Sequence, residues 1–159
     1  MKLSTRSTYG MRALVELALA SGHGPVSASL IASRQDLSVA YLEQLLHRLK
    51  RQGIVTSIRG PRGGYVLARS PRGITMADIV QVLDGERQAA NGKRHGTNGK
   101  QLHARNGAQR HGQLIAQAVW RCVHERIHES LGAVTLQDLC DTVKTEAGEP
   151  LEHRYVFHI

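Results

Sequence analysis

Aromatic residues are scarce in this chain, at 4% of its 159 residues. Proteins that hold single-stranded nucleic acid stack its bases on aromatic side chains, so this composition argues against that mode of binding. The chain has two cysteines, Cys122 and Cys140, which are too few for a disulfide framework. It has no apolar leader and no apolar run near the roughly 20 residues of a membrane span. We therefore expect a cytoplasmic protein with no membrane partner.

The residue patterns of common enzymes are also missing. No nucleophile is paired with a base, no glycine loop that could cradle a phosphate precedes a helix, and no zincin spacing is present. We therefore predict that the chain is not an enzyme. Acidic residues number 13 against 21 lysines and arginines, which leaves a net charge of +8. Such a balance favours a polyanionic partner, most simply duplex nucleic acid.

A capped amphipathic helix is predicted between Ser38 and Gly53. Its apolar residues recur at i, i+3, i+4 and i+7, which predicts one buried stripe formed by Leu42, Leu45, Leu46 and Leu49. Ser38 is placed to cap the N-terminus of this helix, and Gly53 is placed just beyond its C-terminus. The opposite face carries small, amide and cationic side chains, which are the kinds that reach base edges and phosphates in a major groove.

Two short strands follow this helix, at Val55–Arg59 and Tyr65–Ala68, and predict a hairpin with a glycine-rich tip. Upstream, helices are predicted at Thr5–Ser21 and Ser27–Arg34, with Val26 as a short strand between them. Two helices joined by a short turn and followed by a hairpin predict a winged helix-turn-helix. The predicted fold class is therefore mainly α, with a small β hairpin wing and, farther along the chain, a long dimerisation helix.

The side chains expected to contact DNA lie on the Ser38–Gly53 helix and on the hairpin. Residues on the N-terminal turns of the helix are predicted to face base edges: Ser38, Ala40, Tyr41, Glu43, Gln44 and His47. Gln44 suits adenine, and Glu43 suits the amino group of cytosine. Two arginines farther along are predicted to contact phosphates: Arg48 and Arg51. In the hairpin, arginines beside glycines predict a minor-groove contact: Arg59, Arg62, Gly63 and Gly64. The alternative is a solvated helix face and a solvated hairpin.

The DNA-binding domain is predicted to cover residues 1–84. A capping box at Thr75 opens its last helix, and Asp84–Gly85 is expected to end that helix. Residues 85–112 contain almost no apolar side chain and are predicted to form a flexible basic loop. Imidazoles suit Zn, Ni or Cu, and this loop has three histidines spaced eight apart: His95, His103 and His111. No cysteine or paired carboxylate lies nearby, so no metal site is predicted, and metal binding remains an alternative.

Residues 113–143 are predicted to hold a long helix, Gln113–Leu131, and a short C-terminal helix. The apolar stripe of the long helix covers about half its circumference, which suits packing on its own domain and on a second copy of the chain. Cys122 falls within this stripe and is expected to be buried. The side chains predicted to form the homodimer are Ile115, Val119, Trp120, Val123 and Ile127. The tail 144–159 has no assignment.

Three features of the sequence together resemble one family. They are the segment Arg59–Leu67, which reads Arg-Gly-Pro-Arg-Gly-Gly-Tyr-Val-Leu, the run Tyr41–Leu45, and Trp120. This is the IscR/NsrR/CymR-type family of bacterial winged-helix transcription regulators, and the resemblance is strongest to the IscR branch. It covers residues 1 to about 143. The resemblance implies a homodimer that binds a double-stranded DNA operator, and a repressor that responds to a redox, sulfur or iron signal.

The resemblance also implies an iron–sulfur cluster, which its cluster-bearing members hold in the loop before the long helix. The last cluster cysteine would fall near Leu114 and an accompanying histidine near Gln117, and no cysteine precedes Cys122. Leucine offers no ligand for iron, so the usual cysteine-ligated cluster cannot be built and no cofactor is predicted. Two other functions stay open. One is a sensor that binds metal or a cluster through other histidines and cysteines, and the other is a winged-helix module that binds protein.

Overall fold

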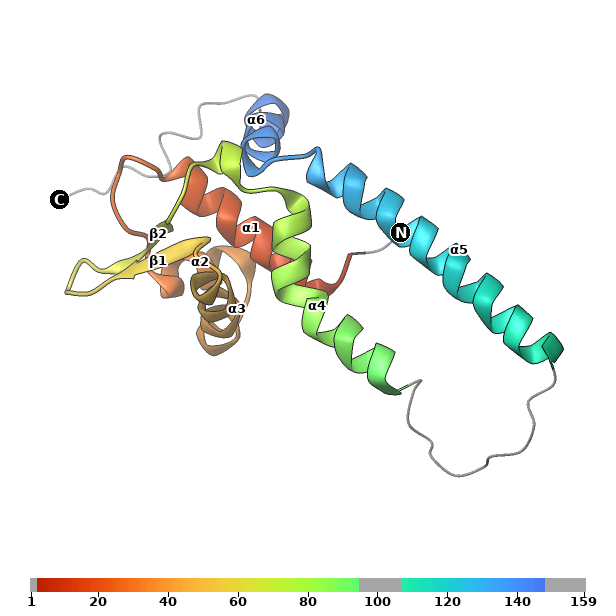
Figure 1. Cartoon of the computed structure of the whole chain (residues 1–159). Helices are drawn as coiled ribbons and strands as arrows, with labels where there is room; N and C mark the ends of the chain where they lie inside the picture. The colour runs from red at the N-terminus through yellow and green to blue at the C-terminus, as the bar shows by residue number, and fades with distance from the viewer. Residues whose placement is uncertain (1–2, 95–106, 148–159) are drawn as a thin grey trace.

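The computed structural model describes residues 3–94 and 107–147. Its elements in chain order are α1 (Thr5–Leu19), α2 (Ala28–Gln35), α3 (Val39–Arg51), β1 (Val55–Ile58), β2 (Gly64–Leu67), η1 (Pro71–Gly73), α4 (Met76–Arg94), α5 (Gly107–Gly132) and α6 (Leu136–Ala147). Figure 1 shows α1 within the globular part, with α2, α3 and the β1–β2 hairpin close to it, and α5 extending away. The predicted fold class, mainly α with a small hairpin wing, is confirmed.

The helix-turn-helix consists of α2 and α3. The Oγ atoms of Ser27 and Ser38 each accept a hydrogen bond from a backbone N–H three residues later, at 3.2 and 3.3 Å, and so cap the two helices. Between the helices, Asp36 adopts a left-handed conformation with φ 54°, which aspartate tolerates better than most residues. The leucine stripe of α3 is buried, and Gly53 follows the helix with φ 66°. The predicted caps and the predicted buried face are therefore confirmed.

The wing is the antiparallel pair β1–β2, in which Val55 lies opposite Leu67. Val26, predicted as a short strand, adds a single bridge to the wing. Its N–H donates to the carbonyl of Tyr65 at 3.0 Å, and its carbonyl accepts from the Tyr65 N–H at 2.8 Å. A side chain at Gly64 would overlap the backbone of Val26, so this close approach requires glycine.

One hydrophobic core joins the helices of the predicted DNA-binding domain to α6. Its largest fully buried side chains include Leu14, Ile31, Leu42, Leu45, Leu46, Leu49, Ile54, Ile74, Ile79, Leu83 and Leu136. The sequence analysis places α6 in the same region, 113–143, as the predicted dimerisation helix. In the structure, α6 instead contributes Leu136 and Cys140 to this core. A backbone hydrogen bond from Leu136 N–H to the Ile74 carbonyl, at 2.8 Å, ties the start of α6 to the segment before α4.

The prediction that Asp84–Gly85 ends the last helix of the domain is wrong, because α4 continues to Arg94. Aspartate disrupts a helix when its carboxylate competes for nearby backbone groups. Here the Asp84 carboxylate accepts hydrogen bonds from the hydroxyls of Ser4 and Ser7, at 2.5 and 2.7 Å, at the N-terminus of α1. Glycine inside a helix costs only about 1 kcal/mol. The first part of the predicted loop is therefore helical, and residues 95–106 of that loop lie outside the described residues.

The long helix α5 begins at Gly107, earlier than the predicted Gln113, and ends at Gly132. It packs against α4. Among its described side chains, Ile127 and Leu131 are half-buried and the others are exposed. Cys122 is therefore exposed, and the prediction that it is buried is wrong for the single chain. The reason is that the domain covers only the C-terminal part of the helix.

Candidate nucleic-acid interface

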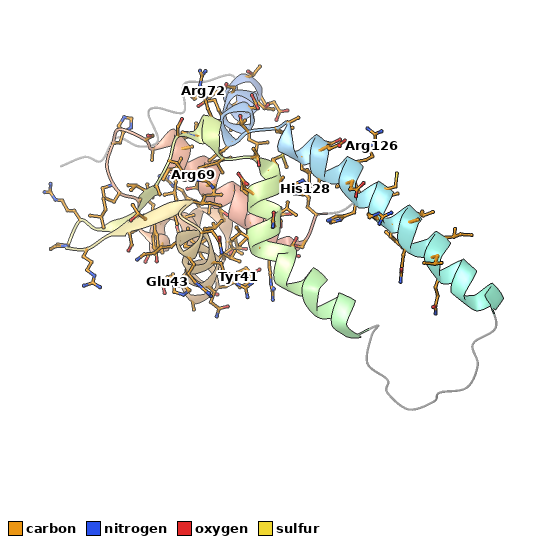
Figure 2. The ribbon with its side chains drawn as sticks, viewed as in Figure 1. Tyr41, Glu43, Arg69, Arg72, Arg126 and His128 are labelled. Atoms are coloured by element: carbon orange, nitrogen blue, oxygen red, sulfur yellow. The ribbon has the colours of Figure 1, made fainter. Side chains whose placement is uncertain are left out.

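The outer face of α3 and the wing together form a shallow groove. Its volume is about 810 Å³, and it is lined by Ala40, Glu43, Gln44, His47, Arg48, Arg51 and Tyr65. All of these except Tyr65 are predicted DNA contacts, so the fold brings most of the predicted helix set onto one surface. Figure 2 shows Glu43 at the end of the domain that lies away from α6.

The groove presents a mixture of polar groups to the solvent. The carboxylate of Glu43, the amide of Gln44 and the imidazole of His47 are exposed along one face of α3. Arg51 is exposed and Arg48 is half-buried on the later turns. Amides, carboxylates and guanidinium groups are the side chains that match the donors and acceptors of base edges and phosphates. The exposed side chains of this surface therefore match the chemistry of a nucleic-acid duplex.

Tyr65 belongs to this groove, although the sequence reasoning assigned it only to a strand. Partial burial raises the pKa of its phenol, and the nearby Glu43 carboxylate raises it further. The hydroxyl therefore stays protonated at neutral pH and can donate a hydrogen bond. The sequence contained one signal for this role. Tyr65 directly follows Gly64 in the glycine-rich wing, the segment that is predicted to approach DNA.

Two of the predicted base contacts also have roles inside the domain. Ser38 caps α3 with its Oγ atom. Tyr41 is half-buried, and its ring lies edge-on to that of Tyr9, with 6.3 Å between the ring centres. The Arg12 guanidinium lies 5.5 Å from the centre of the Tyr9 ring, which adds a cation–π contact to this cluster. That Ser38 and Tyr41 reach DNA remains a prediction.

The tip of the wing carries two exposed arginines, Arg59 and Arg62. Gly60 lies between them with φ 126°, a conformation that side chains rarely adopt. A side chain at Gly63 would overlap the carbonyl oxygen of Ile58. Glycine is therefore needed at position 63 to close the hairpin, and the approach of Gly63 and Gly64 to DNA remains a prediction.

A contact between α3 and the wing was missed by the sequence reasoning. The Lys50 ammonium donates a hydrogen bond of 2.5 Å to the Ser57 hydroxyl on β1. This bond links α3 to β1, although neither side chain lines the groove. No local pattern predicts it, because the two side chains meet only after the chain has turned at Gly53.

A row of apolar side chains is exposed along α5. The exposed fractions are 73% for Trp120, 63% for Leu114, 55% for Val119, 52% for Ile115 and 43% for Val123. Ile127, the fifth predicted dimer residue, is instead half-buried against the globular part of its own chain. At 100° per residue, Ile115, Val119, Trp120 and Val123 fall within about 140° of the helical circumference, whereas Leu114 lies outside that sector. An exposed apolar face of this kind marks an interaction site in a soluble protein. The prediction that four of these side chains meet a second copy fits this exposure.

The two cysteines and the predicted loop histidines lie far apart in the chain. Burial raises the pKa of the Cys140 thiol to about 11, so this thiol is unreactive at neutral pH. His95 and His103 lie outside the described residues, and the structure places the backbone of His111 in α5. In the described part of the chain, no three His, Cys, Asp or Glu side chains gather closely enough to hold a metal ion.

Comparison with known proteins identifies the family. The family model described as "Rrf2: Iron-dependent Transcriptional regulator" matches residues 3–142, which is most of the chain. The chain belongs to the Rrf2 family. Its winged-helix domain and the start of α6 both lie within the matched region. Rrf2 proteins are transcription regulators and not enzymes, which confirms the predicted absence of enzymatic activity.

Individual relatives of this Rrf2 protein point the same way. It is 34% identical over 139 residues to the HTH-type transcriptional regulator IscR of Xenorhabdus nematophila, covering 87% of this chain and 79% of that one. Among solved structures, it is similar to T. potens IscR, with a TM-score of 0.68 and 35% identity. The match covers 98% of this chain and 97% of that one. It is also similar to CymR, the global cysteine regulator of B. subtilis, with a TM-score of 0.65 and 36% identity. That match covers 89% of this chain and 98% of the CymR chain.

These findings confirm the resemblance to the IscR/CymR-type regulators. The chain is an IscR-like transcriptional regulator with a winged-helix fold, which implies regulation through DNA binding. In the part of the chain that the structure describes, no helix is long and apolar enough to cross a membrane.

The iron in the family description raises the question of whether these residues suit an iron–sulfur cluster. The thiols of the chain are Cys122, exposed on α5, and Cys140, buried in α6. Clusters are held by several thiolates, with imidazoles in some proteins. Two thiols on separate helices, one of them buried and protonated, do not form such a donor set. The residues of this Rrf2 protein therefore do not fit a cysteine-ligated cluster.

Proposed function

We propose that this Rrf2 protein is a homodimeric, sequence-specific DNA-binding repressor. The observation that carries the proposal is the groove on the outer face of α3, where base-reading and phosphate-binding side chains lie beside a wing tipped by two arginines. The first turns of α3 enter the major groove of the duplex, and Arg59 and Arg62 of the wing reach the neighbouring minor groove.

Within this arrangement, individual side chains have different tasks. Gln44 pairs with an adenine, and Glu43 accepts a hydrogen bond from a cytosine amino group. Arg48 and Arg51 contact phosphates, which position the protein without selecting the sequence. Lys50 holds the wing against α3, so that both elements engage the duplex together.

The dimer is formed by α5. Its exposed apolar face, which carries Ile115, Val119, Trp120 and Val123, covers the same face of a second copy. A two-fold dimer presents two α3 helices and therefore reads a palindromic operator with two half-sites. The net charge of +8 supports such binding to a polyanion.

The signal belongs to the redox, sulfur or iron group that the family resemblance implies. The cysteine ligands of a cluster are missing, so a cluster-based signal has no support in this chain. CymR of B. subtilis, whose structure is similar, is described as a cysteine regulator, which supports a signal from sulfur metabolism.

Selection from a random duplex library at physiological salt tests the proposal. The wild-type chain should enrich a palindromic motif, and Gln44→Ala should relax one position in each half-site with a loss of about 1–3 kcal/mol per contact. Gln137→Ala, on α6 and away from the groove, is the matched control and should enrich the wild-type motif. If no motif is enriched, the proposal fails and the winged fold serves another partner.

A further inference from the structure

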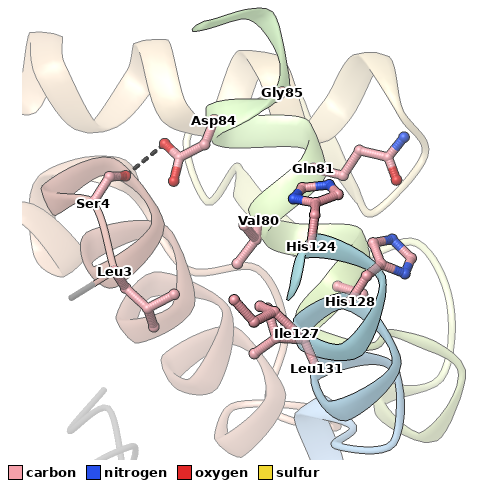
Figure 3. A pocket seen from close by; sticks show the side chains of 11 residues that line it. Leu3, Ser4, Val80, Gln81, Asp84, Gly85, His124, Ile127, His128 and Leu131 are labelled. Atoms are coloured by element: carbon pink, nitrogen blue, oxygen red, sulfur yellow. Dashed lines mark hydrogen bonds between the residues drawn. The ribbon is translucent and has the colours of Figure 1, made fainter. Parts of the chain in front are cut away.

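A pocket of about 470 Å³ lies between the globular part of the chain and α5. Residues of α4, of α5 and of the segment before α1 line it, and Figure 3 shows it from close by. The volume falls within the range of pockets that hold small organic ligands. None of the predicted DNA contacts lines it, so it is separate from the α3 groove.

The pocket combines an apolar wall with polar groups on two opposite sides. The apolar part is formed by Leu3, Ala77, Val80, Ile127 and Leu131. Figure 3 shows the imidazoles of His124 and His128, one helical turn apart on α5, close to the amide of Gln81 on α4. Within the described residues, these three side chains have no hydrogen-bond or ion-pair partner. They therefore offer free donors at one end of an apolar pocket.

The other polar group, Asp84, is already engaged. Its two carboxylate oxygens accept hydrogen bonds from Ser4 and Ser7, at 2.5 and 2.7 Å. Figure 3 shows the carboxylate across the pocket from the two imidazoles, directed toward Ser4. The pocket thus presents free hydrogen-bond donors on one side and, on the other, a carboxylate whose two oxygens each accept a hydrogen bond from a serine hydroxyl.

We propose that this pocket binds a small organic carboxylate with an apolar body. The carboxylate accepts hydrogen bonds from His124, His128 and Gln81, and the apolar body packs on Val80, Ile127 and Leu131. Imidazole N–H groups and an amide NH₂ are suitable donors for a carboxylate, and hydrogen bonds to a charged group are the stronger kind. This input goes beyond the redox, sulfur or iron signal of the proposed function.

Two other occupants fit the pocket less well. A metal ion needs a third ligand beside the two imidazoles, and the described residues provide no such group. An amine would face three donors and an acid whose oxygens are already hydrogen-bonded. A second copy of the chain is the remaining alternative occupant, because α5 also carries the proposed dimer surface. Titration with a small carboxylate distinguishes a pocket that is open to ligand from one that a second copy fills.

The position of the pocket couples it to the DNA-binding surface. α4 packs against α5 on one side and against α3 on the other. A ligand held between α4 and α5 therefore favours one arrangement of these helices. Ligand and operator then change each other's affinity by the same factor, as linkage requires. This coupling rests on the proposed DNA-binding function, whereas the binding of the carboxylate does not.

Isothermal titration calorimetry of the full chain with octanoate tests the site, with octylamine and 1-octanol as matched probes. Octanoate should bind saturably with one molecule per chain, and more tightly than either of the other two. Octylamine binding as tightly as octanoate would overturn the assignment of the polar end. A lack of saturable octanoate binding, as expected if a second copy fills the pocket, would overturn the proposal.

Variants locate the binding. His124→Ala combined with His128→Ala should weaken octanoate binding by about tenfold or more, which is the usual effect of removing hydrogen bonds to a charged group. Val80→Phe should block the apolar end. His23→Ala, at an exposed histidine in the loop after α1, is the control and should bind octanoate as the wild type does. Wild-type affinity in the double histidine variant would contradict the proposed site, whether or not Val80→Phe folds.

A second titration separates this inference from the proposed function. Saturating octanoate should change the Kd for the selected duplex at least about threefold in the wild type and leave it unchanged in the double histidine variant. A wild-type Kd unaffected by bound octanoate would overturn the coupling. A chain that binds octanoate but enriches no duplex would refute the proposed function while leaving the carboxylate site in place.

Discussion

The exposed tryptophan on α5 gives the sharpest test of the dimer. A tryptophan side chain buries roughly 150–250 Å², and Trp120 is 73% exposed in the single chain. About 150 Å² of apolar surface is therefore left to bury in each copy, which at ~25 cal/mol per Å² is worth about 4 kcal/mol per copy. Association converts buried area to affinity incompletely, so this value is an upper limit.

Trp120→Lys removes this surface and places a charge in the interface of both copies. We expect the dimer dissociation constant to rise at least about 100-fold, which corresponds to about 2.7 kcal/mol. Sedimentation velocity over a range of protein concentrations measures the change directly. Circular dichroism should show an unchanged helix content, because Trp120 lies outside the hydrophobic core.

Glu129→Lys is the matched control for this substitution. Residue 129 lies on the side of α5 opposite Trp120, since nine residues correspond to half a turn beyond two full turns. Its carboxylate forms an exposed ion pair with Arg126 at 3.5 Å, and such pairs contribute little. The control should remain dimeric. If Trp120→Lys sediments as the wild type does, or if Glu129→Lys dissociates equally, the apolar row is not the dimer interface.

Three further predictions concern the wing, the fold and the thiols. Arg62→Ala should weaken binding to most duplexes and make the negative slope of log K against log salt shallower by about one unit in anisotropy titrations. Asp84→Ala leaves the buried Ser7 hydroxyl without its acceptor, and should lower the free energy of unfolding by about 2–3 kcal/mol in urea denaturation. In the Trp120→Lys variant, which is expected to be monomeric, iodoacetamide at pH 8 should alkylate Cys122 and spare Cys140, whose pKa is raised to about 11 by burial and by Asp141.

The first two predictions have control variants, and the third has a second readout in the pH dependence of stability. Arg72→Ala, in η1 away from the wing, should leave the salt slope unchanged, and an unchanged slope in Arg62→Ala would remove the wing from the interface. Asp141→Asn, exposed on α6, is the control for Asp84→Ala and should unfold as the wild type does.

The folded state holds the Cys140 proton more tightly than the unfolded state, so the free energy of unfolding should fall as pH rises from about 9 toward 11. Equal alkylation of both thiols at pH 8, read by mass spectrometry, would contradict the burial of Cys140.

The sequence predicts the DNA-binding half of the molecule well, because its signals are local. The leucine spacing of α3, the serine caps and the glycines of the wing each fix a short segment, and the structure contains all of them. The groove follows from these elements, since the face of α3 opposite the buried leucines is the exposed one. Tyr65 and Lys50 escaped prediction because their contacts form only when the wing folds back on α3.

The second half of the chain was harder to predict because its contacts join distant residues. Asp84 does not end α4, since its acceptors are used by hydroxyls 77 and 80 residues earlier in the chain. Cys122 lies in an apolar stripe, but periodicity does not say whether a stripe meets the same chain or another one. Likewise, nothing in the pattern of α6 shows that Leu136 and Cys140 complete the core of the DNA-binding domain.

The most direct test of the central claim is the affinity and stoichiometry of the wild-type chain on a duplex with the selected motif. Sedimentation with fluorescence anisotropy at physiological salt should show two chains per duplex. It should also show binding at least about 1,000-fold tighter than to a shuffled duplex of the same composition. One chain per duplex, or equal affinity for the selected and the shuffled duplexes, would contradict the account of a sequence-specific homodimeric regulator.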